Sequence, residues 1–208
     1  MIQGSEAWID ARRGKVTASR VADVTAKTKT GWGAGRANYM AELICERLTD
    51  CTAPSFINDA MRWGTETEPQ ARDAYAALKG VDVMEIAFID HPEIVMSGAS
   101  PDGLVGDNGL IEIKCPNTAT HLDTLLSETV PGKYLTQIHW QLACTGRAWC
   151  DFVSFDPRLP PEMQLFTQRI ERDLSTILDL ETDVTGFLRE LDGKVAQLTA
   201  KYARKDAA

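Results

Sequence analysis

The sequence predicts an α/β (α+β) fold in which a central mixed β-sheet of about five strands is flanked by helices. Short runs of alternating or continuous apolar residues, typical of strands, fall mainly between residues 81 and 170. Amphipathic helical patterns lie before, between and after these runs, so helices are available to cover both faces of a sheet. The length of 208 residues fits one hydrophobic core, and a single domain over residues 1–208 is expected.

The composition is that of an ordinary globular protein, with 44% hydrophobic and 25% charged residues. No apolar run approaches the roughly 18 residues of a membrane span. The first residues show no secretory signal, so a cytoplasmic location is expected. Five cysteines without a C-x-x-C pair and only three histidines argue against a disulfide framework and a zinc site.

Charge is distributed unevenly along the chain. The net charge is −8 at pH 7, yet residues 1–36 contain seven Lys or Arg and three Asp or Glu. Such a basic segment is usually a solvated face. It is also where a polyanion would bind, so residues 1–36 need a second, more specific signal before a function is assigned to them.

The N-terminal quarter predicts short helices followed by a longer one. Ser5 is a plausible helix cap, and two short helices joined near Gly14 are expected over residues 5–26. The glycine-rich stretch 30–35 predicts a flexible loop. Apolar spacing over residues 36–48 predicts an amphipathic helix.

The next predicted helix carries one charged residue on its buried stripe. The stripe consists of residues three and four positions apart: Met61, Gly64, Glu68, Ala71, Tyr75 and Leu78. Pro69 follows Glu68 directly, and two arrangements are consistent with this pattern. Either Pro69 kinks or restarts a helix in which Glu68 is paired, protonated or bound to a cation, or Pro69 starts the helix and Glu68 lies outside it in solvent.

Strands are predicted over residues 81–90 and 93–98, and residues 100–116 predict a β-hairpin. The pair Asn108 and Gly109 tolerates the positive φ angles of a tight turn, and strand-like runs flank it on both sides.

The hairpin brings ionisable groups together. Period-two alternation puts Ile111 and Ile113 on one face of the strand and Glu112 and Lys114 on the other. The returning strand places Asp102 within a residue or two of Glu112 and Lys114. Two carboxylates and an ammonium group therefore converge on one sheet face.

The C-terminal half predicts helices and two further strands. A short helix plus loop is expected over residues 117–132 and a helix over 133–145. The nearly continuous apolar run 148–155 predicts a strand covered on both faces, and residues 163–170 predict a last strand. A long amphipathic C-terminal helix is predicted over residues 172–205.

The converging groups are suited to metal-dependent phosphodiester hydrolysis. Asp102 and Glu112, with Glu68 added, supply the oxygen ligands that Mg²⁺ prefers. Lys114 lies on the same strand face and could hold or deprotonate an attacking water. The spacing alone is also consistent with a turn residue and a surface ion pair.

The motifs together resemble a known family. Pro101-Asp102 followed by Glu112-Ile113-Lys114 resembles the PD-(D/E)xK nuclease signature, which has a restriction-endonuclease-like core. The surrounding residues are similar to those of phage lambda exonuclease and the YqaJ-type alkaline exonucleases. The matching runs, in family order, are Ala7-Trp8, Arg12 to Ser19, Trp63-Gly64 with Glu68, Ser100 to Gly103, Glu112 to Pro116, Tyr134 to Gln137 and Asp156-Pro157-Arg158.

This resemblance implies roles for individual residues. Asp102 and Glu112 would be the central metal ligands, with Glu68 and the backbone carbonyl of Ile113 completing the set, and Lys114 would assist the water. Two Mg²⁺ ions are expected, with Mn²⁺ as a possible substitute. The residues at the family's 5′-phosphate-binding positions are Arg12, Ser19, Ser100 and Gln137.

The resemblance also implies an activity and partners. It implies a 5′-to-3′ exonuclease that digests linear double-stranded DNA to mononucleotides and leaves a 3′ single strand for recombination by an annealing protein. A ring-shaped homotrimer is implied, in the host cytoplasm if a phage or prophage encodes the chain. Residues 1–36 would be a DNA-end-binding segment and residues 58–155 the catalytic core.

Two alternatives remain open on the sequence: an endonuclease of the same fold, and a catalytically silent DNA-binding recombination scaffold. The sequence departs from the family pattern at three places: the Arg12-Arg13 doublet, Pro69 after Glu68, and the C-terminal helix, which has little recognisable motif.

Overall fold

The main sheet of the protein has five strands in the order β10-β9-β8-β7-β4. The computed structural model describes residues 2–29, 31–52 and 58–202. Strand β8 runs parallel to β9, and the other neighbours are antiparallel. The predicted mixed sheet of about five strands is confirmed. The strands are β4 (Val83–Met84), β7 (Gly103–Val105), β8 (Gly109–Lys114), β9 (Trp149–Phe155) and β10 (Leu165–Glu171).

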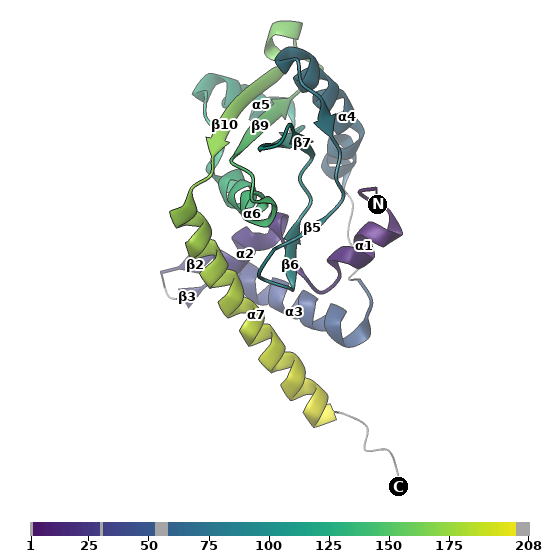
Figure 1. The fold of residues 1–208 in the computed structure, drawn as a ribbon, viewed down its shortest axis with the longest axis vertical. Helices are drawn as coiled ribbons and strands as arrows, with labels where there is room; N and C mark the ends of the chain where they lie inside the picture. Colours follow the sequence, from purple (N-terminus) through teal and green to yellow (C-terminus); the bar gives the residue numbers. More distant parts are fainter. Residues whose placement is uncertain (1, 30, 53–57, 203–208) are drawn as a thin grey trace.

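Helices lie on both sides of this sheet, and the long helix α7 runs from the end of β10 away from it (Figure 1). The helices are α1 (Glu6–Arg12), α2 (Val21–Thr25), α3 (Ala34–Thr49), α4 (Asp59–Lys79), α5 (Thr118–Ser127), α6 (Leu135–Thr145) and α7 (Leu174–Tyr202). Short 3-10 helices are η1 (Ala18–Arg20), η2 (Gly132–Tyr134) and η3 (Pro161–Met163).

Strand β8 is covered on both faces, and its alternate residues face different helices. Ile111 and Ile113 belong to an apolar cluster with Tyr75 of α4. Leu110 belongs to a second, larger cluster that includes Ile138 of α6 and residues of α7. Since side chains alternate along a strand, Glu112 points to the α6 side. The predicted division of the strand into two faces is confirmed.

Residues 81–90, predicted as one strand, form two strands in different sheets. Strand β4 is the edge of the main sheet, whereas β5 (Ile89–Asp90) pairs with β6 (Ser97–Ala99). Strand β6 also pairs in parallel with β1 (Val16–Thr17), which completes a three-stranded sheet. The alternation predicted strand residues correctly, but the chain crosses from one sheet to the other between them.

The predicted flexible loop over residues 30–35 is only partly a loop. Strand β3 (Gly31–Trp32) pairs antiparallel with β2 (Lys27–Thr28), and helix α3 already begins at Ala34. Thr30 lies outside the described residues. The predicted helix cap at Ser5 is present, because its Oγ accepts a hydrogen bond from the Trp8 amide at 3.3 Å.

Helix α4 continues through Pro69 without a break. The arrangement in which Pro69 starts the helix and leaves Glu68 in solvent is therefore wrong. Within the predicted stripe Ala71 and Tyr75 are buried, whereas Met61 and Leu78 at its ends are 51% and 64% exposed. The sheet covers the middle of this helix and not its ends.

The predicted long C-terminal helix is present as α7, and the last predicted residues, 203–205, lie outside the described part of the chain. Ion pairs connect α7 to α3, including one between Arg36 and Glu190 at 2.8 Å. Among the described helices, none is both long and apolar enough to cross a membrane.

The hairpin turn lies earlier in the chain than the predicted turn at Asn108 and Gly109. Val105 pairs with Gly109, so the loop consists of residues 106–108, and Gly106 adopts the positive φ of 50°. Gly109 is the first residue of β8 instead of a turn residue. A Cβ atom at this position would lie 2.1 Å from the ring of Trp149, so close packing explains why glycine occurs there.

We expect Gly109→Ala to destabilise the protein by about 1–3 kcal/mol, because Trp149 would have to move out of a packed position. The guanidinium group of Arg169 also packs on the indole ring of Trp149, with its carbon atom 3.4 Å from the ring centroid. Urea unfolding followed by circular dichroism would measure this change. Gly186→Ala in α7 is the matched control, since a Cβ atom added there would have no atom within 4 Å; it should be neutral or stabilising by up to about 1 kcal/mol. Equal stability of Gly109→Ala and the wild type would contradict the explanation.

Candidate active site

The carboxylate of Glu112 is at the centre of the candidate site. It lies on β8 with an exposed fraction of 0%. Its Oε1 atom accepts a hydrogen bond from Nε2 of Gln137 at 2.6 Å and lies 2.5 Å from Nζ of Lys114. Its Oε2 atom accepts a hydrogen bond from Nε2 of Gln141 at 2.5 Å. Because an unpaired carboxylate is costly to bury, these three donors make the position of Glu112 tenable.

Asp102 lies beside Glu112 in the hairpin. It is one residue beyond the pair formed by Gly103 and Ile111, which puts it level with Glu112 on the neighbouring strand. Its Oδ2 atom accepts a hydrogen bond from the Ile113 amide at 2.6 Å. Burial, together with the negative charges of Glu112 and Glu68, raises the pKa of Asp102 well above its usual value.

Glu68 reaches the same cluster from helix α4. Burial raises the pKa of Glu68, and the charge of Glu112 adds to this effect although the positive charge of Arg72 opposes it. Oε1 of Glu68 accepts a hydrogen bond from Nη2 of Arg72 at 2.6 Å. Arg72 also donates from Nε to the carbonyl oxygen of Asp102 at 3.1 Å, so it links the helix to the hairpin.

Lys114 is a cation in this environment. Burial alone would lower its pKa, but the carboxylates of Glu112 and Asp102 outweigh burial, and the pKa of Lys114 is raised. The ammonium group therefore carries a positive charge next to two acidic side chains.

Two residues of the site were not singled out from the sequence. Arg72 lies four residues after Glu68, and this helix spacing is a recognisable signal for an ion pair. Gln141 is fully buried, and its only signal is a polar residue on the otherwise apolar face of the helix 135–145. Nothing in the local sequence indicates that Gln141 would bind Glu112.

The cluster has the ligand chemistry of a divalent-cation site. As the side chains stand, no three His, Cys, Asp or Glu residues of the described ranges are arranged to hold a metal ion. Lys114 and Arg72 contact carboxylate oxygens that a cation would need. Burial and the charge of Glu112 raise the pKa of Asp102 and of Glu68, and the three carboxyl groups nevertheless form a donor set that fits a hard cation such as Mg²⁺.

A second group of predicted residues is organised by Trp8. The indole Nε1 donates to Oγ of Ser100 and to the Ala87 carbonyl oxygen, each at 2.9 Å. The guanidinium carbon of Arg12 lies 3.9 Å from the centroid of the same indole ring. Because Ser100 precedes Asp102 by two residues, this group lies beside the acidic cluster.

Arg12 and Arg13 differ in their partners. Arg13 pairs with Asp10 and, at 3.2 Å, with Asp50. Arg12 forms no ion pair with any described residue, and burial lowers its pKa from the usual value. Ser19 is exposed on η1, and no hydrogen bond joins it to the other predicted residues within the described chain.

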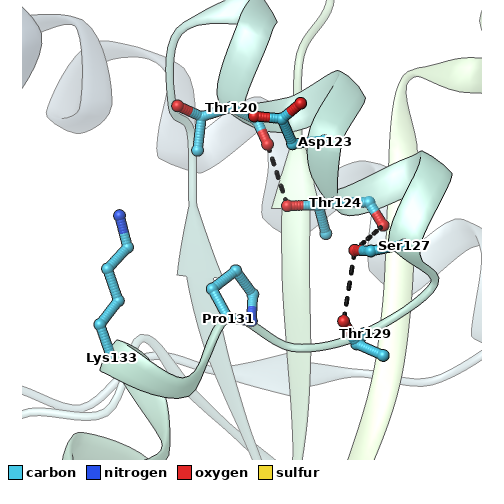
Figure 2. A pocket seen from close by; sticks show the side chains of 7 residues that line it. All are labelled: Thr120, Asp123, Thr124, Ser127, Thr129, Pro131 and Lys133. Atoms are coloured by element: carbon cyan, nitrogen blue, oxygen red, sulfur yellow. Dashed lines mark hydrogen bonds between the residues drawn. The ribbon is translucent and has the colours of Figure 1, made fainter.

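A surface cavity of the described residues lies apart from this site. It has a volume of about 250 Å³ and lies where α5 faces the start of η2 (Figure 2). Its lining consists of Thr120, Asp123, Thr124, Ser127, Thr129, Pro131 and Lys133, none of which is a predicted site residue.

The run Asp156-Pro157-Arg158 supports the site from the end of β9. Burial alone would raise the pKa of Asp156, but hydrogen bonds from Arg158 and Thr118 lower it to about 2. The guanidinium carbon of Arg158 also lies 4.5 Å from the ring centroid of Trp63 on α4. This contact links the end of β9 to the helix that carries Glu68.

The mixed sheet, with Asp102 directly before β7, Glu112 on the neighbouring strand β8 and Lys114 two residues further on, defines a nuclease of the PD-(D/E)xK class. A family model described as the YqaJ-like viral recombinase domain matches residues 7–148. The chain belongs to this family, and the resemblance drawn from the motifs is confirmed.

Solved structures agree with this assignment. Two crystal structures of LHK-Exo, an alkaline exonuclease from Laribacter hongkongensis, one of them in complex with dAMP, are each 55% identical to the chain. Each match covers 96% of this chain and 99% of LHK-Exo, with a TM-score of 0.90. A phage related exonuclease from Haemophilus somnus 129PT, at 16% identity, shares the fold with a TM-score of 0.72 over 91% of this chain and 99% of its own. No curated protein sequence matches the chain.

We expect Asp156→Asn to lower the stability of the protein at pH 7 by about 1–2 kcal/mol, because it removes a charge-assisted interaction with Arg158. The folded-state pKa of about 2 lies below the ordinary value of 3.8. The stabilisation is therefore fully present above the unfolded-state pKa and is lost as the pH falls through the folded-state pKa. Chemical denaturation of both proteins between pH 7 and pH 2 should show the difference shrinking below about pH 4. A stability difference that does not change with pH would contradict this cause. The control is Asp82→Asn, at an exposed position, which should have little effect on stability at any pH.

Proposed function

We propose that the protein is a Mg²⁺-dependent 5′-to-3′ exonuclease that acts on linear double-stranded DNA. The observation that carries the proposal is the meeting of three carboxyl groups, from Glu68, Asp102 and Glu112, with the charged Lys114 at the hairpin. A buried group of like charges is unfavourable unless a cation or a substrate uses it.

The proposed metal ligands are the three carboxylates and the carbonyl oxygen of Ile113. Bound Mg²⁺, or Mn²⁺ in its place, would activate the attacking water and offset charge on the scissile phosphate, with two ions as the expected number. Lys114, held as a cation by its acidic neighbours, orients the water and offsets negative charge in the transition state.

The proposed site for the 5′-phosphate consists of Arg12, Ser19, Ser100 and Gln137. Arg12 supports this role best, since its guanidinium group is half-buried and forms no ion pair with the described residues. Guanidinium groups bind phosphate through charge-assisted and often bidentate hydrogen bonds. Arg13 is less suited because Asp10 and Asp50 already engage it.

The proposed products are mononucleotides and a 3′ single strand that a recombination annealing protein would use. The relative LHK-Exo has been crystallised with dAMP, which supports a nucleotide as product. The proposal includes a homotrimer ring, whose closed symmetry would let an acidic chain surround DNA if its basic groups line the channel.

Asp102→Asn and Lys114→Ala should each lower nucleotide release from a 5′-phosphorylated linear duplex in Mg²⁺ by about 100-fold or more. The first removes a charged oxygen ligand and the second a positive charge at the reacting phosphate. Release of acid-soluble nucleotides from end-labelled DNA measures the effect, and chelation of Mg²⁺ should abolish release by the wild type.

Asp107→Asn, at an exposed position in the hairpin turn, is the matched control and should retain activity. Unchanged release by Asp102→Asn and Lys114→Ala would refute the assigned site. Rapid nicking of closed circular DNA by the wild type would favour an endonuclease instead.

Arg12→Ala should reduce the preference for a 5′-phosphate over a 5′-hydroxyl end by about tenfold or more, because a charge-assisted contact to the terminal phosphate is lost. Initial rates on the two duplexes at limiting concentration measure the preference. Arg13→Ala should keep it. The reverse result, in which only Arg13→Ala loses the preference, would assign the phosphate to Arg13.

A further inference from the structure

The oxygen Oε1 of Glu112 has no acceptor position left. A carboxylate oxygen accepts about two hydrogen bonds, and those of Oε1 are taken by Nε2 of Gln137 at 2.6 Å and Nζ of Lys114 at 2.5 Å. A cation that binds Oε1 must therefore displace one of these donors.

Glu112 is fully buried, and this oxygen lies on the side of the carboxylate that is nearer to solvent. The donor to the other oxygen, Oε2, is Gln141, which has an exposed fraction of 0% and lies one helical turn deeper on α6. Gln137 is half-buried, and the side chain of Lys114 is 27% exposed. A cation arriving from solvent meets Oε1 first.

Of the two donors on Oε1, Gln137 is the one that leaves at the lower cost. Its amide is neutral, whereas the ammonium group of Lys114 is held by the charges of both Glu112 and Asp102. Both contacts are charge-assisted by the carboxylate, but the lysine contact adds the Coulombic attraction between two full charges. The freed amide needs another acceptor, because an unpaired polar group in a half-buried position is unfavourable.

We propose that Gln137 couples the DNA end to the metal site: it blocks Oε1 of Glu112 in the DNA-free protein and turns to the 5′-phosphate when the end binds. The inference rests on the proposed function, in which the 5′-phosphate supplies the new acceptor. Release of Oε1 then raises the affinity for Mg²⁺, and by thermodynamic reciprocity Mg²⁺ raises the affinity for a phosphorylated end by the same factor.

The coupling has a structural consequence for the free protein. Without DNA the carboxylate is already satisfied, so the site has reduced affinity for cations. With a 5′-phosphate in place, the same carboxylate loses one competitor. The cation would therefore be bound most tightly at a correctly positioned end.

The test is calorimetric titration of Mg²⁺ into the full chain alone, and into its complexes with two duplexes that differ only in a 5′-phosphate or 5′-hydroxyl. Phosphorothioate linkages at the 5′ end slow cleavage during the titration. For the wild type, the dissociation constant for Mg²⁺ should be about three- to tenfold lower with the phosphorylated duplex, the value expected for one hydrogen bond.

Gln137→Leu keeps the size of the side chain and removes the donor. This variant should bind Mg²⁺ about three- to tenfold more tightly than the wild type without DNA, because the competing donor is gone. It should also lose the difference between the two duplexes. Gln141→Leu is the same substitution one turn further along α6. This variant should keep the difference between the duplexes, since the buried side chain at position 141 cannot reach DNA.

Circular dichroism and melting curves establish that both variants are folded. Equal Mg²⁺ affinities with the two duplexes, or no gain in affinity for DNA-free Gln137→Leu, would overturn the coupling. Nucleotide release is measured on the same preparations. Release without coupling would refute this role of Gln137 alone, whereas absence of both Mg²⁺ binding and release would refute the proposed function as well.

Discussion

The burial of one carboxylate, that of Glu112, constrains the arrangement of the elements around it. Strand β8 is covered on both faces, so the acidic side chain cannot reach bulk water and needs donors from the protein. Gln137 and Gln141 supply them from one helix, four residues apart and on different oxygens. A shift of α6 by one turn along β8 would leave only one of the two glutamines in reach and one carboxylate oxygen without its amide donor, so this carboxylate favours a single register between helix and strand.

Other elements are attached to the hairpin through single polar side chains. Arg72 of α4 contacts Glu68, the Asp102 carbonyl and, at 3.2 Å, Glu85. Trp8 of α1 donates to the oxygens of two segments before the hairpin. Each of these side chains has more than one partner, and a displacement of its element would leave several polar groups unpaired. The acidic cluster and the Trp8 group are therefore held in a defined relation by the same physical requirement that holds the fold.

The parts that the sequence predicted are those set by local geometry. Alternation along a strand is a local property, which is why the faces of Glu112 and Lys114 were predicted correctly. The position of Glu68 was left open because Pro69 is compatible with both a helix start and a continuous helix, and packing of α4 on the sheet decided between them. Gln141 was missed because its partner is 29 residues away. Residues 81–90 were predicted as one strand because alternation does not reveal which sheet a residue joins.

The basic N-terminal segment illustrates why net charge alone is a weak argument for DNA binding. Of its seven basic residues, those in ion pairs are Arg13, Lys15, Arg20, Lys27 and Arg36. Within the described chain, the other two, Arg12 and Lys29, have no ion pair. Lys29 is exposed, so water accounts for its charge. Arg12 is half-buried against Trp8, and although the charge of Glu46 acts on it, no carboxylate contacts its guanidinium group within the described chain, which is unfavourable for a partly buried cation. The argument for a phosphate partner therefore rests on this single guanidinium group and not on the charge of the segment.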